Sequence, residues 1–323
     1  MPQSTLISRR EALVGLAAAG SLAASPSIAG APLLGPLTPV ANRVVLGGFE
    51  VTTIFDGGIV LDGPHPIFGQ NVEASEVEAL VAANGLPPTK MEIGFTPVVV
   101  NTGSELVLFD TGNGAGRRPN AGHLRERLGA AGYKPEDIDK IVITHMHPDH
   151  IGGLMEDGAP AFPNATYVTG AAEYDFWSPE ERLTGGTERV AKLVQSNVKP
   201  LAEKMSFIKP GDAVASGIEA VDAFGHTPGM LNFHIESDGK RVMLIADTAN
   251  HFVASMQRPD WHVRFDGDKE KAAATRKRIL GMISADKIPF TGYHMPFPAM
   301  GYLEAKGEGF HYSPETYQFE AAG

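Results

Sequence analysis

The stretch Thr144-His145-Met146-His147-Pro148-Asp149-His150-Ile151-Gly152-Gly153 places four side chains that can bind a metal within six residues. It directly follows a run of β-branched residues, which predicts a short buried strand. On an extended segment His145 and His147 share a face, because side chains repeat every second residue. The turn at the following proline directs Asp149 and His150 toward a second point nearby. With only 11 histidines in the chain, this cluster favours a metal site over a polar surface loop.

Three further side chains of the same chemistry follow other apolar runs. His226 lies in Gly225-His-Thr-Pro-Gly229, Asp247 follows Leu244-Ile-Ala, and His294 follows Thr291-Gly-Tyr. A single histidine or aspartate at a strand end is more often a hydrogen-bonded structural residue than a ligand. Here, however, each lies at a strand end, and strands that run alike bring such ends to one side of a sheet. We therefore expect these residues to join the histidine cluster.

The amino-acid composition excludes several classes of protein and of site. The chain has 323 residues, of which 43% are hydrophobic, which is enough for a large buried core and too much for a disordered protein. A formal charge of −11 disfavours a partner with a phosphate backbone, so we expect no nucleic-acid binding. There is no cysteine, which excludes disulfides, thiolate zinc sites and cysteine nucleophiles. Any metal must be bound by histidine, aspartate or glutamate.

The first 31 residues resemble a twin-arginine export signal. Arg9 and Arg10 precede a weakly apolar stretch at 12–24, followed by Pro26 and small residues as far as Ala31. The alternative is an N-terminal helix of the mature fold. The stretch is shorter than the roughly 18 residues that span a bilayer, and no second spanning segment follows, so we expect no stable membrane anchor. The prediction is a signal at 1–31, a single hydrolase domain at 32–323, and a periplasmic or secreted protein.

Strand and helix patterns alternate along the mature chain. Strands are predicted at 43–61 (a strand–turn–strand unit), 97–101, 105–110, 141–144, 166–168, 218–224, 231–235, 241–245 and 288–291. Helices are predicted at 72–84, 123–131, 188–205 with an interruption at Pro200, and 268–284. Strands and helices mixed in both halves favour a layered α/β domain over a bundle or a barrel.

The H-x-H-x-D-H run followed in order by His226, Asp247 and His294 resembles the metallo-β-lactamase superfamily. The resemblance covers most of the chain after about residue 45, and it implies an αββα sandwich with two mixed sheets flanked by helices. It also implies the ligand sets of two metals. His145, His147 and His226 would bind one metal, Asp149, His150 and His294 would bind the other, and Asp247 would bridge them. Asp110, in Leu108-Phe109-Asp110-Thr111-Gly112, matches an aspartate that supports the ligands, although a turn-forming role explains its spacing equally well.

Such a site suits hydrolysis. Two divalent ions roughly 3.5–4 Å apart lower the pKa of a bridging water and polarise the substrate, with Asp149 and Asp247 as the predicted catalytic carboxylates. Five imidazoles and two carboxylates favour two Zn²⁺ ions, although Mn, Fe or Co suits the same ligands.

Within the superfamily the sequence is most similar to secreted methyl-parathion-hydrolase-like enzymes and their lactonase relatives. The strings that carry this likeness are Val100-Asn-Thr-Gly-Ser104, Ala130-Ala-Gly-Tyr133, His150-Ile-Gly-Gly-Leu-Met155, Phe162-Pro-Asn-Ala165, Asp175-Phe-Trp177 and Gly225-His-Thr-Pro-Gly229. Trp177 matches an aromatic of that group's substrate pocket, with core packing as the alternative. Tyr293 and His251 are two further candidates for the pocket. The basic segment 113–120, where phosphotriesterases have an aromatic, argues against an organophosphate specialist.

The resulting hypothesis is a dinuclear hydrolase of lactones or aryl esters, with phosphotriesters as side substrates. The first alternative is a dedicated organophosphate hydrolase. The second is a metal-binding protein without catalysis, which the presence of all seven ligand positions disfavours. The expected partner is a small ester or lactone, and related secreted enzymes imply a homodimer by analogy.

Overall fold

The first large sheet is built from the apolar and β-branched runs of the N-terminal half. The computed structural model describes residues 33, 37 and 39–317. In spatial order this sheet contains β1 (Ala41–Leu46), β2 (Phe49–Ile54), β5 (Val98–Asn101), β6 (Leu106–Phe109), β7 (Lys140–Ile143), β10 (Thr166–Gly170) and β11 (Met205–Ile208). Strands β6, β7, β10 and β11 are parallel, and the others pair antiparallel, so the sheet is mixed.

The second large sheet comes from the C-terminal half. Its strands, in spatial order, are β12 (Ala213–Ala215), β13 (Ile218–Asp222), β14 (Leu231–Ser237), β15 (Lys240–Leu244), β16 (Phe290–Thr291), β17 (Met300–Lys306) and β18 (Gly309–Pro314). Only the β15–β16 pair is parallel. The two central parallel regions end at the same edge of the domain, which is where the histidine cluster begins.

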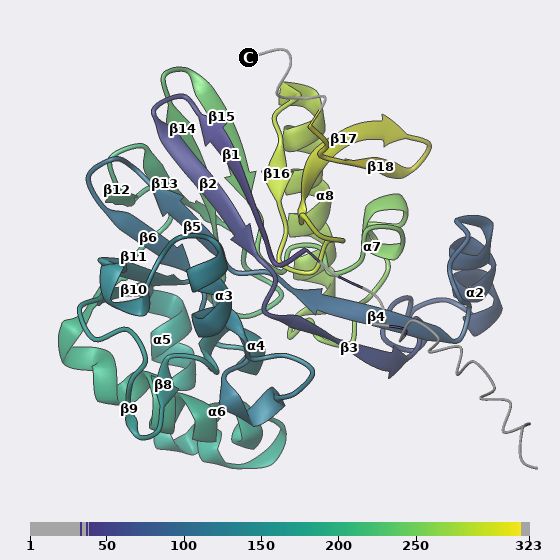
Figure 1. The fold of residues 1–323 in the computed structure, drawn as a ribbon. Coiled ribbons are helices and arrows are strands. Elements are labelled where there is room, and N and C mark those ends of the chain that lie inside the picture. Colours follow the sequence, from purple (N-terminus) through teal and green to yellow (C-terminus); the bar gives the residue numbers. More distant parts are fainter. Residues whose placement is uncertain (1–32, 34–36, 38, 318–323) are drawn as a thin grey trace, which may run out of the picture. The chain divides into compact units, whose positions relative to one another are not determined.

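The two sheets pack face to face and helices cover their outer faces. Val51, Val100 and Phe109 of the first sheet meet Phe233 and Leu244 of the second in one buried cluster. Within the described residues, the α-helices are α2 (Ala74–Ala83), α3 (Leu124–Ala130), α4 (Pro148–Ile151), α5 (Ala171–Trp177), α6 (Glu188–Leu193), α7 (Ala254–Gln257) and α8 (Lys269–Asp286). Helices α3, α5 and α6 cover the first sheet, and α7 and α8 cover the second (Figure 1). This confirms the expected αββα sandwich.

Some local elements differ from the sequence-based expectation. The predicted strand–turn–strand unit at 43–61 contains three strands, and the third, β3 (Gly57–Asp62), leaves the sheet to pair with β4 (Lys90–Phe95) as a separate ribbon. The predicted helix at 188–205 continues beyond α6 as a π-helical turn at Val194–Val198 and a 3₁₀ segment at Lys199–Lys204. The change at Lys199 reflects Pro200, which has no N–H for the helical ladder. A short hairpin, β8 (Met155–Glu156) and β9 (Ala159–Pro160), was not expected.

The N-terminal segment falls largely outside the described residues. Contacts within the chain separate Met1–Thr38 from Pro39–Gly323, and the layers above belong to the second unit. The export signal at 1–31 lies outside the described residues and stays a prediction. Among the helices that are described, none combines the length and apolar character needed to cross a membrane.

Replacing Phe233 tests how much the fold depends on the contact between the sheets. Its ring is fully buried and lies 5.0 Å from the ring of Phe109 on the facing sheet. We expect Phe233→Ala to lower the free energy of unfolding by about 3–5 kcal/mol, measured by urea denaturation, because it leaves a cavity between two rigid layers. Val45→Thr, at an exposed position of β1, should change it by about 0.5 kcal/mol or less. Equal losses in the two variants would contradict this account.

Candidate metal centre

Four segments that follow strands carry the predicted ligands to one edge of the sandwich. His145 and His147 follow β7, and α4 then carries Asp149 and His150. Pro148 is the first residue of α4 and His147 its extended N-cap, so the chain turns sharply between the two pairs. His226 follows β13, Asp247 follows β15 and His294 follows β16. The residues therefore meet because strand ends of both sheets lie together, as the sequence predicts.

The seven side chains converge in two groups. One ligand atom from each of His145, His147, His226 and Asp247 lies within 4.8 Å of the others. The same is true of a second group, Asp149, His150 and His294. This division is the one that the resemblance implies, with three imidazoles on one side and one carboxylate with two imidazoles on the other.

Asp247 lies between the two groups. Its Oδ2 is 3.3 Å from Nε2 of His226 in the first group and 3.0 Å from Nε2 of His294 in the second. Its Oδ1 is 3.2 Å from Nε2 of His150. A carboxylate that contacts ligands of both groups is suited to bridge two cations.

Asp110 orients two of the imidazoles from behind. Its Oδ2 accepts hydrogen bonds from His150 Nδ1 and from the Thr144 hydroxyl, both at 2.8 Å. The Thr144 oxygen in turn lies 3.1 Å from Nδ1 of His145. With their Nδ1 protons held outward, both rings present Nε2 to the centre. The residue also has φ 61°, so the supporting role and the turn role that the sequence left open coincide at one position.

The remaining rings are fixed in similar ways. His226 Nδ1 lies 2.8 Å from Oδ1 of Asp266, and His294 Nδ1 donates to the carbonyl of Gly94 at 2.8 Å. Asp266 is held by the fully buried guanidinium of Arg276, whose Nη2 lies 2.8 Å from its other oxygen. The ring of His147 is held differently, since its Nδ1 faces Nε2 of His226 at 2.9 Å.

The electrostatics of the cluster favour an added positive charge. Burial holds the pKa of His145 well below its usual range and, together with the neighbouring His226, lowers the pKa of His147 to about 3. Burial opposes a charge on His226 as well, but the hydrogen bonds to Asp247 and Asp266 outweigh it and raise its pKa to about 9. Burial also disfavours the Asp247 carboxylate, yet the adjacent His294 and His150 hold its pKa well below the normal value.

Unpaired buried atoms show that the site fits a metal. Among the described residues, Nε2 of His145, Nε2 of His150 and Oδ1 of Asp247 are buried without a hydrogen-bond partner. Buried polar groups are normally satisfied, so such a set of inward lone pairs calls for a cation. Imidazole nitrogens and carboxylate oxygens without sulfur are ligands for a divalent metal such as Zn²⁺.

The site is most open at one segment. In each group one member is only partly buried, namely His147 in the first and Asp149 in the second, and both lie at the start of α4. The other five are buried. The centre is therefore nearest to solvent on the side of these two residues.

Two predicted pocket residues are buried beside the centre. The Tyr293 hydroxyl donates to the Asp149 carbonyl at 2.5 Å, and its ring stacks on His150 at 3.9 Å between ring centroids. Trp177 donates from Nε1 to Glu173 and meets His147 edge-on at 6.4 Å. Both side chains thus pack around the ligands, and a direct contact with substrate stays a prediction for each.

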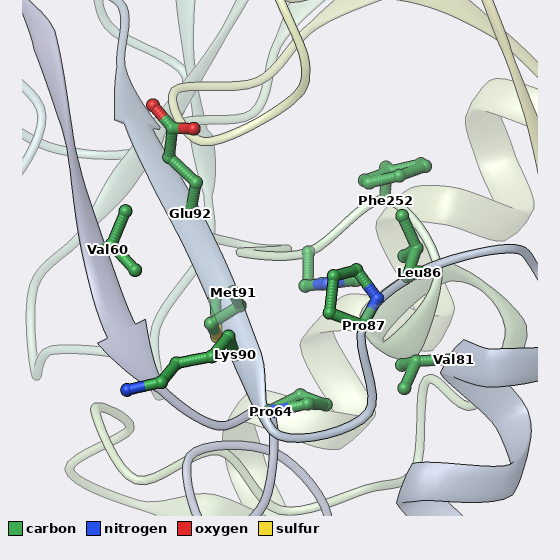
Figure 2. A pocket seen from close by; sticks show the side chains of 10 residues that line it. Val60, Pro64, Val81, Leu86, Pro87, Lys90, Met91, Glu92 and Phe252 are labelled. Atoms are coloured by element: carbon green, nitrogen blue, oxygen red, sulfur yellow. The ribbon is translucent and has the colours of Figure 1, made fainter.

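His251 lines a different pocket. Its Nδ1 accepts from the backbone N–H groups of residues 253 and 254, and burial lowers its pKa to about 4. The pocket it lines has a volume of about 380 Å³, and none of the seven ligand candidates lines it. Val81, Leu86, Pro87 and Phe252 lie around this space (Figure 2). A role for His251 at the metal centre has no support from this placement.

Three residues that support the ligand candidates could not be recognised from any sequence motif. Asp266 and Arg276 form the buried pair behind His226, and Glu173 accepts hydrogen bonds from both segments that carry the first group. Each lies in a loop or helix without a motif. Only the fold, which joins residues up to 56 positions apart, reveals their contacts.

Known proteins share this sequence pattern and fold. The sequence profile of the Metallo-beta-lactamase superfamily matches residues 96–282, more than half of the chain. An N-acyl homoserine lactonase of Bacillus sp is 26% identical over 255 residues, which cover 78% of this chain and 90% of the lactonase.

Solved structures agree with the fold. AidC, a dizinc quorum-quenching lactonase in complex with the product N-hexnoyl-L-homoserine, has a TM-score of 0.77 and 26% identity, covering 86% of this chain and 98% of AidC. The hydrolase AbOPH of the beta lactamase superfamily has a TM-score of 0.80 and 24% identity, covering 87% of this chain and 99% of AbOPH. At this identity the similarity supports the fold and nothing further. With its profile match, its αββα sandwich and its converging histidines, the chain belongs to the metallo-β-lactamase superfamily.

Proposed function

We propose that this protein is a dinuclear metal-dependent hydrolase that opens the ring of small lactones, with aryl esters as further substrates. The observation that carries the proposal is the position of Asp247 between two groups of inward-facing ligands. The lactonase relative from Bacillus sp and the dizinc lactonase AidC support the choice of lactones.

Each group would hold one divalent cation. His145, His147 and His226 would bind the first and Asp149, His150 and His294 the second, with Asp247 shared. Bound divalent cations supply Lewis acidity, which lowers the pKa of water and polarises a carbonyl oxygen. Zn²⁺ is the proposed metal, since the donor set contains five imidazoles and no sulfur.

The residues of the chain orient the ligands and carry protons. Asp110 and Asp266 hold the Nδ1 protons of His150 and His226, so that Nε2 of both rings keeps its lone pair directed inward. Asp149 is the more exposed carboxylate, with 20% of its side chain accessible, compared with 4% for Asp247. It is thus placed to move a proton between water and the alkoxide that leaves when a lactone opens.

Export is proposed on the sequence alone. The paired arginines Arg9 and Arg10 and the apolar stretch at 12–24 support a periplasmic or secreted location. A homodimer is likewise proposed only by analogy with related secreted enzymes.

Removal of metal should abolish hydrolysis and weaken the fold. Chelation leaves five imidazoles and two carboxylates close together without the cations that they would bind, so we expect loss of lactone turnover and a lower melting temperature. A metal that binds only the folded protein adds about 2.7 kcal/mol of stability at a hundredfold excess over its Kd. Thermal shift and activity assays before and after Zn²⁺, Co²⁺ or Mn²⁺ is returned test this. Full activity in metal-free protein would refute the proposal.

Replacing Asp247 tests the bridge. We expect Asp247→Ala to reduce bound metal below the wild-type content, because both groups lose a ligand. The loss in kcat/KM should exceed the about 10- to 100-fold that removal of an outer hydrogen-bond partner costs. Elemental analysis of purified protein gives the metal content. Asp175→Asn, at an exposed position of α5, is the control and should retain both metal and activity. An unaltered metal content in Asp247→Ala would disprove the bridge.

A substrate panel separates the candidate activities. We expect kcat/KM for N-hexanoyl homoserine lactone to exceed that for phenyl acetate and methyl paraoxon by about tenfold or more, a difference of about 1.4 kcal/mol in activation free energy. The highest value on methyl paraoxon would instead identify an organophosphate hydrolase. No turnover of any substrate by protein with two bound metals would identify a metal-binding protein without catalysis.

A further inference from the structure

Glu173 is a fully buried carboxylate in the first turn of α5. Its Oε1 accepts hydrogen bonds from the backbone N–H of Met146 at 2.9 Å and from Nε1 of Trp177 at 2.8 Å. Its Oε2 accepts from the hydroxyl of Thr227 at 2.7 Å and from the backbone N–H of Gly229 at 2.9 Å. One side chain thus contacts two segments that are about 80 residues apart in sequence.

Those two segments carry all three imidazoles of the first group. Met146 is the residue between His145 and His147, and Thr227 directly follows His226. The rings of His147 and His226 meet at 2.9 Å between nitrogen atoms, so a small shift of either segment changes the distance between ligand atoms. The carboxylate of Glu173 joins the backbones that set this distance.

The donors around Glu173 favour a carboxylate at this position. All four partners donate a hydrogen bond, and none accepts one. A glutamine would place its NH₂ group against two of these partners. The Thr227 hydroxyl could turn and accept from it, but a backbone N–H cannot, so at least one buried N–H would lose its acceptor. The position therefore favours glutamate by its hydrogen bonding.

The packing around the loop leaves no room for adjustment. A Cβ at Gly229 would lie 2.1 Å from the backbone nitrogen of Glu173, and a Cβ at Gly170 would lie 2.8 Å from the carbonyl oxygen of Gly229. The loop after His226 thus rests directly on the start of α5. Backbone contact and the carboxylate together fix the loop to this helix.

We propose that Glu173 is a positioning residue that sets the spacing between the His145–His147 segment and His226, and thereby the metal affinity of the three-imidazole group. This role rests on the proposed metal-dependent function, and it assigns a residue that does not itself touch metal or substrate.

The test measures zinc affinity in Glu173→Gln. Competition with a chromophoric chelator should show binding to one of the two sites weakened by about 10- to 100-fold, the usual cost of losing a group that orients ligands. The visible absorption of bound Co²⁺, which reports ligand geometry, should shift. Excess Zn²⁺ should restore part of the lost activity, which a general loss of fold would not allow.

Asp56→Asn is the matched control. Asp56 is also fully buried and accepts four N–H hydrogen bonds, from Asn113, which donates two, and from Gly122 and Leu124. None of these donors belongs to a segment that carries a metal ligand. Its replacement should lower the melting temperature and leave the zinc affinity of the folded protein unchanged.

Thr227→Val keeps the test decisive if Glu173→Gln does not fold, since it removes one of the four donors. Its zinc affinity should fall by less than that of Glu173→Gln, but measurably. Wild-type zinc affinity and Co²⁺ spectrum in either folded variant would overturn the role of Glu173 and leave the proposed function intact. Wild-type protein that binds two metals but does not hydrolyse lactones would remove the proposed function and leave this assignment standing.

Discussion

The metal centre depends on hydrogen bonds that hold the outer nitrogens of its imidazole rings. Asp266 holds His226, Gly94 holds His294, and Asp110 holds His150 directly. Each bond fixes a tautomer and a ring orientation, and so directs a lone pair inward. Without these bonds the rings would rotate and hydrogen-bond to one another or to water. The convergence of seven side chains is therefore a property of their surroundings as much as of the ligands.

These hydrogen bonds place several charges in a dry interior, and the sandwich must tolerate that cost. Removing a charge from water is unfavourable unless partners replace the solvent. Asp266 has Arg276 and His226, and Glu173 has four donors. Burial raises the pKa of Glu173, and its donors oppose that shift. The stability of the domain thus comes from the apolar layers, while the buried charges give the site its geometry.

Much of the architecture could be predicted from local patterns. The β-branched runs at 98–101 and 140–143 form central strands, and Asp268 caps the long helix α8 by accepting from the N–H of Lys271. The H-x-H-x-D-H run and the three later strand ends indicated the seven converging residues, because parallel strands bring their ends together.

The missed features depend on distant partners. Strand β4 alternates buried and exposed residues, yet its partner β3 lies about 30 residues away, beyond a helix. The β17–β18 hairpin is rich in glycine and charged residues, and it only extends a sheet whose centre is formed by other strands.

A further consequence follows from the partial exposure of His147 and Asp149. Both groups of ligand candidates are nearest to solvent at these two neighbouring residues. We therefore expect a molecule bound there to hinder the exchange of cations with solvent and to slow the loss of metal to a chelator.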